Sequence, residues 1–164
     1  MLHAEVIKYR LAVAHLRRGD EPLKLAHAVR HLGDAYRRTG RAADAAPCYA
    51  EALAIYRAQP DARPLDLANA IRSSAALEGD VGHADAAQRL WHEAHALYVA
   101  CNVQAGVAES AARLALLAAQ AGHEEGRRAW LGRAVAAADA AGDAETLHYV
   151  RGVRAQLEGT PPRP

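Results

Sequence analysis

Two groups of histidines have spacings that could support metal chemistry. His27 and His31 are four residues apart, and Asp34 follows three residues later. On a helix these side chains would share one face, an acceptable ligand set for zinc or another borderline cation. His92 and His95 stand three apart in the sequence HEAH, one residue short of the HExxH spacing of zinc proteases. Because that pair has no third ligand, and because histidine pairs on helices are mostly surface residues, we expect no metal and no other cofactor.

The sequence also lacks the patterns of common enzyme sites. Its glycines are isolated, so no glycine-rich phosphate loop is present. The serines, Ser73, Ser74 and Ser110, have no recognisable base nearby in the sequence, and no nucleophile elbow occurs. Cys48 and Cys101 stand in apolar surroundings and are expected to be small buried hydrophobes rather than a disulfide framework. We therefore expect that the protein is not an enzyme.

Composition indicates closely packed helices. Alanine dominates the apolar residues of the 164-residue chain, and phenylalanine is absent. Small side chains suit helices at close range, whereas strands favour β-branched and aromatic residues. The formal net charge of +1 gives no general attraction to nucleic acid or anionic lipid. No signal-peptide pattern or long apolar run occurs, so we expect a cytoplasmic protein with no nucleic-acid or membrane partner.

An internal repeat organises the chain. A shift of 42 residues, and then one of 40, places like residues on one another. The matched sets include Gly40, Gly82 and Gly122; Ala52, Ala94 and Ala134; and Tyr56 and Tyr98. Within each copy, apolar residues recur at intervals of three and four, and a glycine interrupts the pattern. Each copy is therefore predicted to hold two helices with a glycine stop between them.

The repeat predicts an all-α protein of about eight helices in a single domain over residues 1–158. The predicted parts are a leading helix at 1–18, helix pairs at 23–58, 65–101 and 103–141, and a closing helix at 144–158. A shift of 40 places Tyr9 on Tyr49, so the leading helix is interpreted as the second helix of an incomplete repeat. Leu147 and Val150 of the closing helix are expected to cover the exposed edge of the stack. Residues 159–164 are expected to be a disordered tail.

This pattern resembles the tetratricopeptide repeat. That family places a small residue in the first helix, glycine at the turn, and alanine and an aromatic residue in the second helix. The matching residues are Gly33, Tyr36, Gly40, Ala45, Tyr49 and Ala52; then Ala75, Gly82, Ala87, Trp91 and Ala94; then Ala115, Gly122, Leu131 and Ala134. The long period, the run AAPCYAEALAIY and the proline-bearing linker resemble the extended repeats of the kinesin light chain type. The resemblance covers Leu23 to Gly142 and implies a right-handed superhelical array of antiparallel helix pairs, an α-solenoid.

In that family the first helices line a concave groove that binds peptides. The polar residues that the resemblance places there are His27, Arg30, His31, Asp34, Arg37, Arg38, Asn69, Arg72, Ser73, Glu109 and Arg113. They lie away from the apolar stripe, so we expect them to be exposed. Arginine binds carboxylates bidentately and outnumbers the acidic residues here, so the expected partner is a protein or peptide, in particular an acidic one. The expected function is that of a non-catalytic adaptor or scaffold.

One tetratricopeptide subfamily clamps the C-terminal carboxylate of chaperones with lysine, asparagine and arginine. Here Arg30 and Arg113 match in charge. Asp34 and Ser73 stand where asparagines are expected, and Glu109 stands where a lysine is expected. Because two carboxylates in the pocket would repel a third, that ligand class is not expected.

The alternative function is that of a structural, self-associating protein. The incomplete first repeat would leave one end of the stack uncovered, and arrays of this kind dimerise through such ends. Trp91 occupies the aromatic site of its repeat and is expected in the core. Trp130 is one residue off that site, so it is expected to be exposed and available to an interface. A homodimer is compatible with peptide binding.

Overall fold

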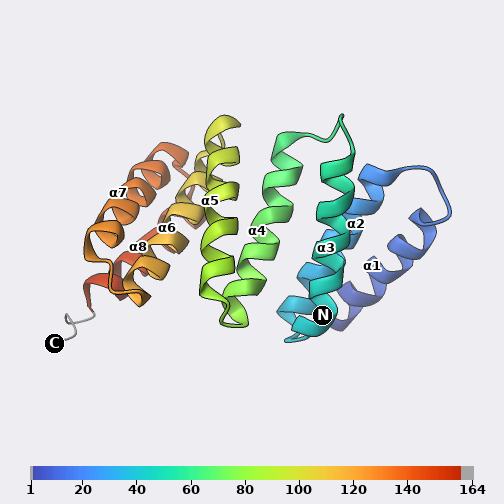
Figure 1. The fold of residues 1–164 in the computed structure, drawn as a ribbon, viewed down its shortest axis with the longest axis horizontal. Helices are drawn as coiled ribbons and strands as arrows, with labels where there is room; N and C mark the ends of the chain where they lie inside the picture. Colours follow the sequence, from blue (N-terminus) through green and yellow to red (C-terminus); the bar gives the residue numbers. More distant parts are fainter. Residues whose placement is uncertain (1, 160–164) are drawn as a thin grey trace. The chain divides into compact units, whose positions relative to one another are not determined.

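The computed structural model describes residues 2–159, which form eight α-helices joined by short turns (Figure 1). Their bounds are α1 Leu2–Leu16, α2 Pro22–Arg38, α3 Ala42–Ala58, α4 Pro64–Asp80, α5 Ala84–Ala100, α6 Gln104–Gln120, α7 Glu124–Ala141 and α8 Ala144–Glu158. No strand occurs within these residues, which confirms the predicted all-α fold of about eight helices. Apart from Gly159, the predicted disordered tail lies outside the described residues.

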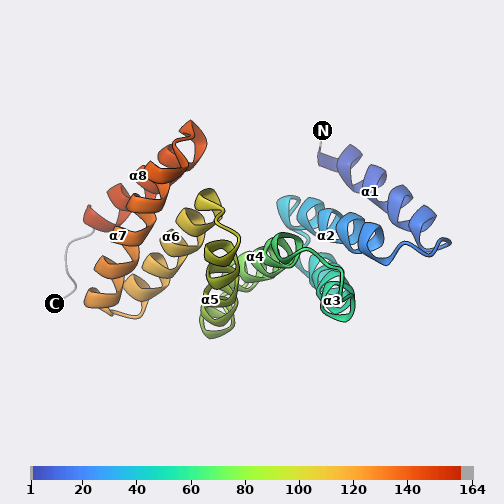
Figure 2. The same ribbon diagram turned by 90° about the horizontal axis from the view of Figure 1, so that it is seen from above.

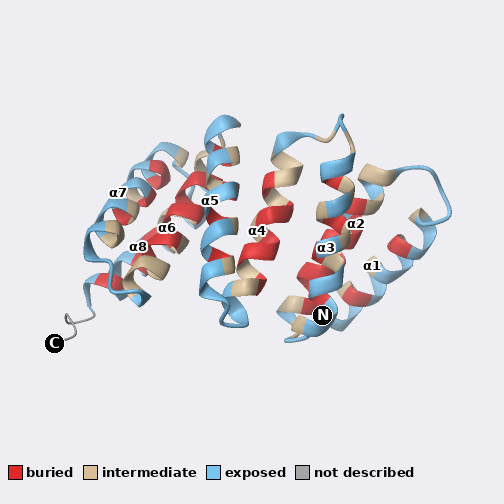
Figure 3. Ribbon diagram, in the orientation of Figure 1, coloured by how far each residue is buried: buried red, intermediate tan, exposed pale blue. Residues whose placement is uncertain are grey.

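The chain forms two compact units, and their boundary falls within α5, between Leu90 and Trp91. The first unit contains α1 to α4. Figure 2 shows α2 lying between α1 and α3, and α4 packs on α3 and, less extensively, on α2. The second unit contains α6, α7 and α8, each of which packs on the other two. Figure 3 shows buried and exposed residues alternating along the helices, as expected when one face of each helix is packed.

The turns within the helix pairs are closed in the same way in both units. Gly40 has a φ of +73°, a left-handed value that residues with a Cβ rarely adopt. The next amide, that of Arg41, donates to the carbonyl of Tyr36 over 2.9 Å. The same bond, spanning five residues, follows Gly82 and Gly122. It satisfies a carbonyl that the end of the helix would otherwise leave free, so the predicted glycine stops are confirmed.

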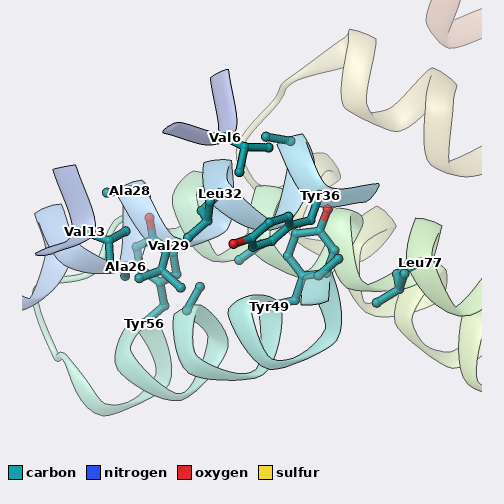
Figure 4. Packing of buried hydrophobic residues seen from close by; sticks show 14 residues of the cluster. Val6, Val13, Ala26, Ala28, Val29, Leu32, Tyr36, Tyr49, Tyr56 and Leu77 are labelled. Carbon is teal, nitrogen blue, oxygen red and sulfur yellow. The ribbon is translucent and has the colours of Figure 1, made fainter. Parts of the chain in front are cut away.

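Small residues let α2 and α3 approach one another in the first unit. A Cβ at Gly33 of α2 would lie 2.6 Å from Cε1 of Tyr49, so only glycine fits there without displacing the ring. Ala52 of α3 is fully buried in the same interface. Figure 4 shows Tyr49 and Tyr56 rising from α3 into the buried cluster that contains Val29. The packing role that the repeat pattern predicts for Gly33 is confirmed.

The second unit uses the same device at a position that the repeat pattern does not mark. A Cβ at Gly106 of α6 would lie 2.4 Å from Cδ1 of Tyr98, which is itself buried. The closing helix α8 buries Val150 and Val153 and packs on both α6 and α7, while Leu147 is half-buried. The predicted cover over the last helix pair is therefore present.

Candidate functional site

The polar residues predicted on the first helices do not share one environment. Arg30 exposes only 7% of its surface, and Asp34, one turn further along α2, is also buried. Arg30 Nη1 donates to Asp34 Oδ2 over 3.1 Å, and the Tyr49 hydroxyl of α3 donates to Oδ1 over 2.8 Å. Burial and the Asp34 carboxylate raise the pKa of Tyr49, so its hydroxyl remains a donor. The expectation that Arg30 is exposed is wrong, because its charge is paired between packed helices.

His31 connects this buried pair to α1. Its ring stacks on Tyr9 with centroids 5.3 Å apart and meets the His27 ring edge-on at 4.5 Å. Arg30 Nη2 lies 2.9 Å from His31 Nε2. A guanidinium can only donate, so Nε2 accepts and the neutral ring carries its proton on Nδ1. Burial, and then the charge of Arg30, lower the pKa of His31 to about 4.

Two of the three side chains with metal-ligand spacing, Asp34 and His31, already have hydrogen-bond partners. Asp34 accepts from Arg30 and Tyr49, and His31 accepts from Arg30. Within residues 2–159, no group of three or more His, Cys, Asp or Glu side chains is arranged to hold a metal ion. The cluster is a hydrogen-bonded support under the outer surface of α2, on which His27 is exposed.

Arg37 and Arg38 reach that surface and join α2 to its neighbours. Arg37 Nη1 lies 2.8 Å from Oδ2 of Asp80, at the end of α4. Arg38 Nη2 lies 2.7 Å from Oε2 of Glu5, on α1. The sequence pattern gives no sign of either partner, because the two carboxylates stand 43 and 33 residues away. Both cations are therefore already balanced by acidic residues of the chain.

The predicted residues of α4 divide in the same manner. Asn69 and Arg72 are half-buried, and neither is without an interaction partner. Ser73 exposes only 2% of its surface, and its hydroxyl has no hydrogen-bond partner among the described residues. Asn69 and Arg72 can contribute to a binding surface, whereas Ser73 belongs to the interior.

In the second unit, Glu109 and Arg113 lie on α6. The Arg113 guanidinium carbon is 5.9 Å from the ring centroid of Trp91 and 5.7 Å from that of Tyr149, so two aromatic rings hold the cation. Burial raises the pKa of Tyr149 against the opposing effect of Arg113. Tyr149 comes from the closing helix, which was predicted only as a cover. Trp91 is 2% exposed, so its predicted core position is confirmed.

A second polar cluster lies on α5 and α7 of this unit. His92 and His95 meet the Trp130 ring edge-on at 5.2 and 5.1 Å, and the Arg133 guanidinium lies 4.5 Å from the same ring. His95 Nδ1 lies 2.9 Å from the buried Ser110 hydroxyl of α6. Burial, and then Arg133, lower the pKa of His95. Two features of the sequence pointed to this cluster: the HEAH spacing, and Trp130, which stands one residue away from the aromatic site of its repeat.

The cysteines show no sign of activation. Cys48 and Cys101 are free and half-buried, less buried than expected. The Cys48 thiol donates to the carbonyl of Asp44 over 3.3 Å. Burial, and then the Glu51 carboxylate, raise the pKa of Cys48 to about 11, so it remains a thiol near neutral pH.

No family model and no curated protein matches the sequence. Among solved structures, the chain is similar to the crystal structure of BtubC (BKLC) from P. vanneervenii, with a TM-score of 0.77 and 19% sequence identity. The match covers 95% of this chain and 65% of that protein, so the chain spans less than two thirds of its length. The chain has a tetratricopeptide-like helical repeat fold. At this identity the likeness shows the fold alone.

In this tetratricopeptide-like fold, α2, α4 and α6 are the first helices of the pairs, and all the predicted groove residues lie on them. The structure brings His27, Arg30, His31 and Asp34 together in one cluster of the first unit. It places Glu109 and Arg113 in the second unit. None of the described helices has the length and apolar character needed to cross a membrane.

Proposed function

We propose that the protein is a non-catalytic interaction module that binds a peptide segment of a partner protein on the polar surface of its first helices. The single observation that carries this proposal is the pair of exposed ion pairs formed by Arg37 and Arg38. Arg38 is exposed and Arg37 is half-buried on α2, and the buried Asp34 carboxylate ties this helix to α3 by accepting from the Tyr49 hydroxyl.

The exposed pairs can be exchanged for contacts with a ligand. The side chains of Asp80 and Glu5 are 52% and 46% exposed. An exposed pair such as Arg38–Glu5 contributes only about 0–1 kcal/mol. A carboxylate of a partner can therefore replace Asp80 or Glu5 at little cost and gain a bidentate contact with arginine. This supports an acidic segment as the ligand. Breaking the buried pair of Arg30 would cost too much for this arginine to contact a ligand directly. Its role is instead to hold α2 in position.

Affinity capture from the native cell extract tests this proposal with two charge-matched double variants. Arg37→Gln with Arg38→Gln removes the proposed contacts. Arg41→Gln with Arg63→Gln is the control, because these exposed arginines also pair with carboxylates, three residues along the chain. A prey protein that is reduced about tenfold or more with the first variant and retained with the second supports the proposal. A prey retained equally by both variants contradicts it.

Self-association is the second candidate function, because α1 has an uncovered apolar stripe. Val6 and Val13 face α2 and are buried, whereas Ile7 and Leu11 are 59% and 68% exposed. The basic residues Lys8, Arg10 and Arg18 are exposed on α1 or just after it, whereas Arg17 is paired with Glu51 and the acidic Glu5 with Arg38. A second copy that docks here would bring like charges together, so the dimer should strengthen as salt increases. Sedimentation equilibrium at low and high salt, with Leu11→Ser as the control, tests this.

A further inference from the structure

The polar cluster on α5 and α7 borders a shallow depression in the second unit. The depression has a volume of about 370 Å³ and is lined by His95, Val99, Gln104, Val107, Arg133, Ala136 and Ala137. Val99 is 55% exposed, which makes it one of the few large apolar side chains at the surface. The lining is thus mostly apolar, and His95, Gln104 and Arg133 are its polar members. The lining shares no residue with the predicted groove residues, although Gln104 and Val107 lie on α6, which is a first helix.

The hydrogen-bonding state of His95 follows from its buried neighbour. The Ser110 hydroxyl directs its one proton to backbone carbonyls of α6, that of Gly106 at 2.7 Å and that of Val107 at 3.1 Å. It must then accept from His95, so the proton of the neutral imidazole lies on Nδ1. The other ring nitrogen, Nε2, is left as a hydrogen-bond acceptor. Because Ser110 is fully buried, the ring is held in one orientation.

Arg133 supplies a positive charge that the protein does not neutralise. Its guanidinium lies over the Trp130 ring, and it forms no ion pair with any described residue. A cation held on an aromatic face is oriented and partly desolvated, and it keeps its full charge for a ligand. Arginine and tryptophan are also the residues that most often dominate protein interfaces.

We infer that this depression is a second binding site, which takes a partner segment that presents an aliphatic side chain next to a carboxylate. The aliphatic side chain packs on Val99 and Val107, the carboxylate pairs with Arg133, and His95 accepts a hydrogen bond from a backbone amide of the segment. Arg133 determines the choice of occupant, because an unpaired cation beside a mostly apolar lining favours an acidic, apolar segment over a basic one.

A pair of peptides tests the inference by NMR. The probes are the capped tetrapeptides acetyl-Ala-Leu-Glu-Ala-amide and acetyl-Ala-Leu-Gln-Ala-amide, which differ only in the charge of one side chain. The readout is the indole N–H signal of Trp130, and the buried Trp91 is the internal reference. For so short a ligand, the expected dissociation constant of the acidic peptide is on the order of 1 mM. The Gln peptide should bind about fivefold or more weakly.

The controls distinguish this site from the proposed peptide-binding surface. Arg133→Gln should make the two peptides bind equally, and Val99→Ser should weaken both. The Arg37→Gln, Arg38→Gln variant should leave the Trp130 response to the peptides unchanged. This holds even if the variant no longer captures the partner protein of the proposed peptide-binding surface. Equal binding of the two peptides to the unaltered protein overturns the inference, as does the absence of a saturable shift. If the chemical shift of Trp130 changes with protein concentration and does not respond to peptide, the site binds a second copy of the chain. That result would also overturn the inference.

Discussion

The arginines that are candidates for ligand binding are held in different ways in the two units, although each unit also contains the other arrangement, at Arg41 over Tyr36 and at Arg127 with Glu124. In the first unit, Arg30, Arg37 and Arg38 each form an ion pair with a carboxylate. In the second unit, Arg113 and Arg133 lie over aromatic rings. A carboxylate neutralises a cation, whereas a ring orients the cation and leaves its net charge intact. The number of arginines on a surface therefore does not give the charge that the surface offers to a ligand.

The largest effect is expected from the buried carboxylate of the first unit. Asp34→Ala leaves the charge of Arg30 buried and unpaired and removes the acceptor of the Tyr49 hydroxyl, so it should lower the free energy of unfolding by about 3–5 kcal/mol. Urea denaturation measures this loss. The matched control, Asp44→Ala, breaks the exposed pair with Arg41 and should cost no more than about 1 kcal/mol.

A double replacement separates the charge from the packing at this position. Arg30→Met combined with Asp34→Leu removes both charges and should recover much of the loss of the single variant. Equal losses in Asp34→Ala and Asp44→Ala would mean that solvent reaches Arg30. In that case the two units would not differ in the way described.

Adding a Cβ at a close helix contact should destabilise both units to the same degree. The two units would then differ only in how their charges are held. Gly33→Ala places a Cβ against Tyr49, and Gly106→Ala places one against Tyr98. Both rings are buried, so each substitution should lower the free energy of unfolding by about 1–3 kcal/mol. Thermal and urea unfolding of the two variants would measure this loss of stability.

Two other helical glycines serve as controls for that experiment. A Cβ at Gly79 of α4 or Gly132 of α7 would meet no atom within 4 Å. Alanine there should stabilise its helix by about 0.5–1 kcal/mol, because it restricts the unfolded chain and favours the helix. A Gly106→Ala variant as stable as the Gly132→Ala variant would contradict the close approach of α6 to Tyr98.

The pH dependence should sharpen the comparison through His31. Its pKa in the folded protein is about 4, below the ordinary value of 6.5, so the unfolded chain binds the proton more readily between these values. Stability should therefore fall as the pH decreases from 6.5 to 4 and then change no further through this group. After allowance for partial exposure, the loss should be roughly 1–2 kcal/mol.

The variant His31→Gln isolates that contribution. It should be less sensitive to pH over this interval than the unaltered protein, when chemical denaturation is followed at several pH values. His148→Gln, at an exposed position of α8, is the control and should retain the full dependence. An unchanged pH profile in His31→Gln would place the titrating group elsewhere, for example at His95.

Salt should give the smallest effect and the most direct contrast between the units. Arg38→Gln breaks an exposed pair with Glu5 and should cost up to about 1 kcal/mol at low salt. At 1 M salt the screening length is about 3 Å, so this cost should disappear. Arg113→Gln should cost about 1 kcal/mol at both salt concentrations, because its partners are rings. A salt-dependent loss in Arg113→Gln would show a carboxylate partner instead.

The repeating small residues made the fold predictable from the sequence. Gly33, Ala52 and Gly40 recur at fixed positions because helix spacing and helix ends each depend on one local residue. The packing at Gly106 could not be predicted in this way, since it occurs once and depends on where Tyr98 lies in space.

The candidate site was less predictable, because the partners of its residues come from distant parts of the chain. The face of α2 that carries Arg30 was identified from the repeat, but its burial depends on Tyr49 and on the ring of Tyr9. Asp80 and Tyr149 have no periodic relation to the arginines they contact. Helical periodicity indicates which residues share a face and does not show what covers them.

The shared turn also bears on how such a chain could change in length. The bond that closes each turn joins atoms of one helix end and the residue after the glycine, so the joint does not depend on which helix follows. Duplication of the stretch from Arg41 to Gly82 would place Arg41 directly after a glycine, the same junction that exists at Gly40. Gene duplication could therefore add a helix pair in one step, and the joint would need no compensating mutation.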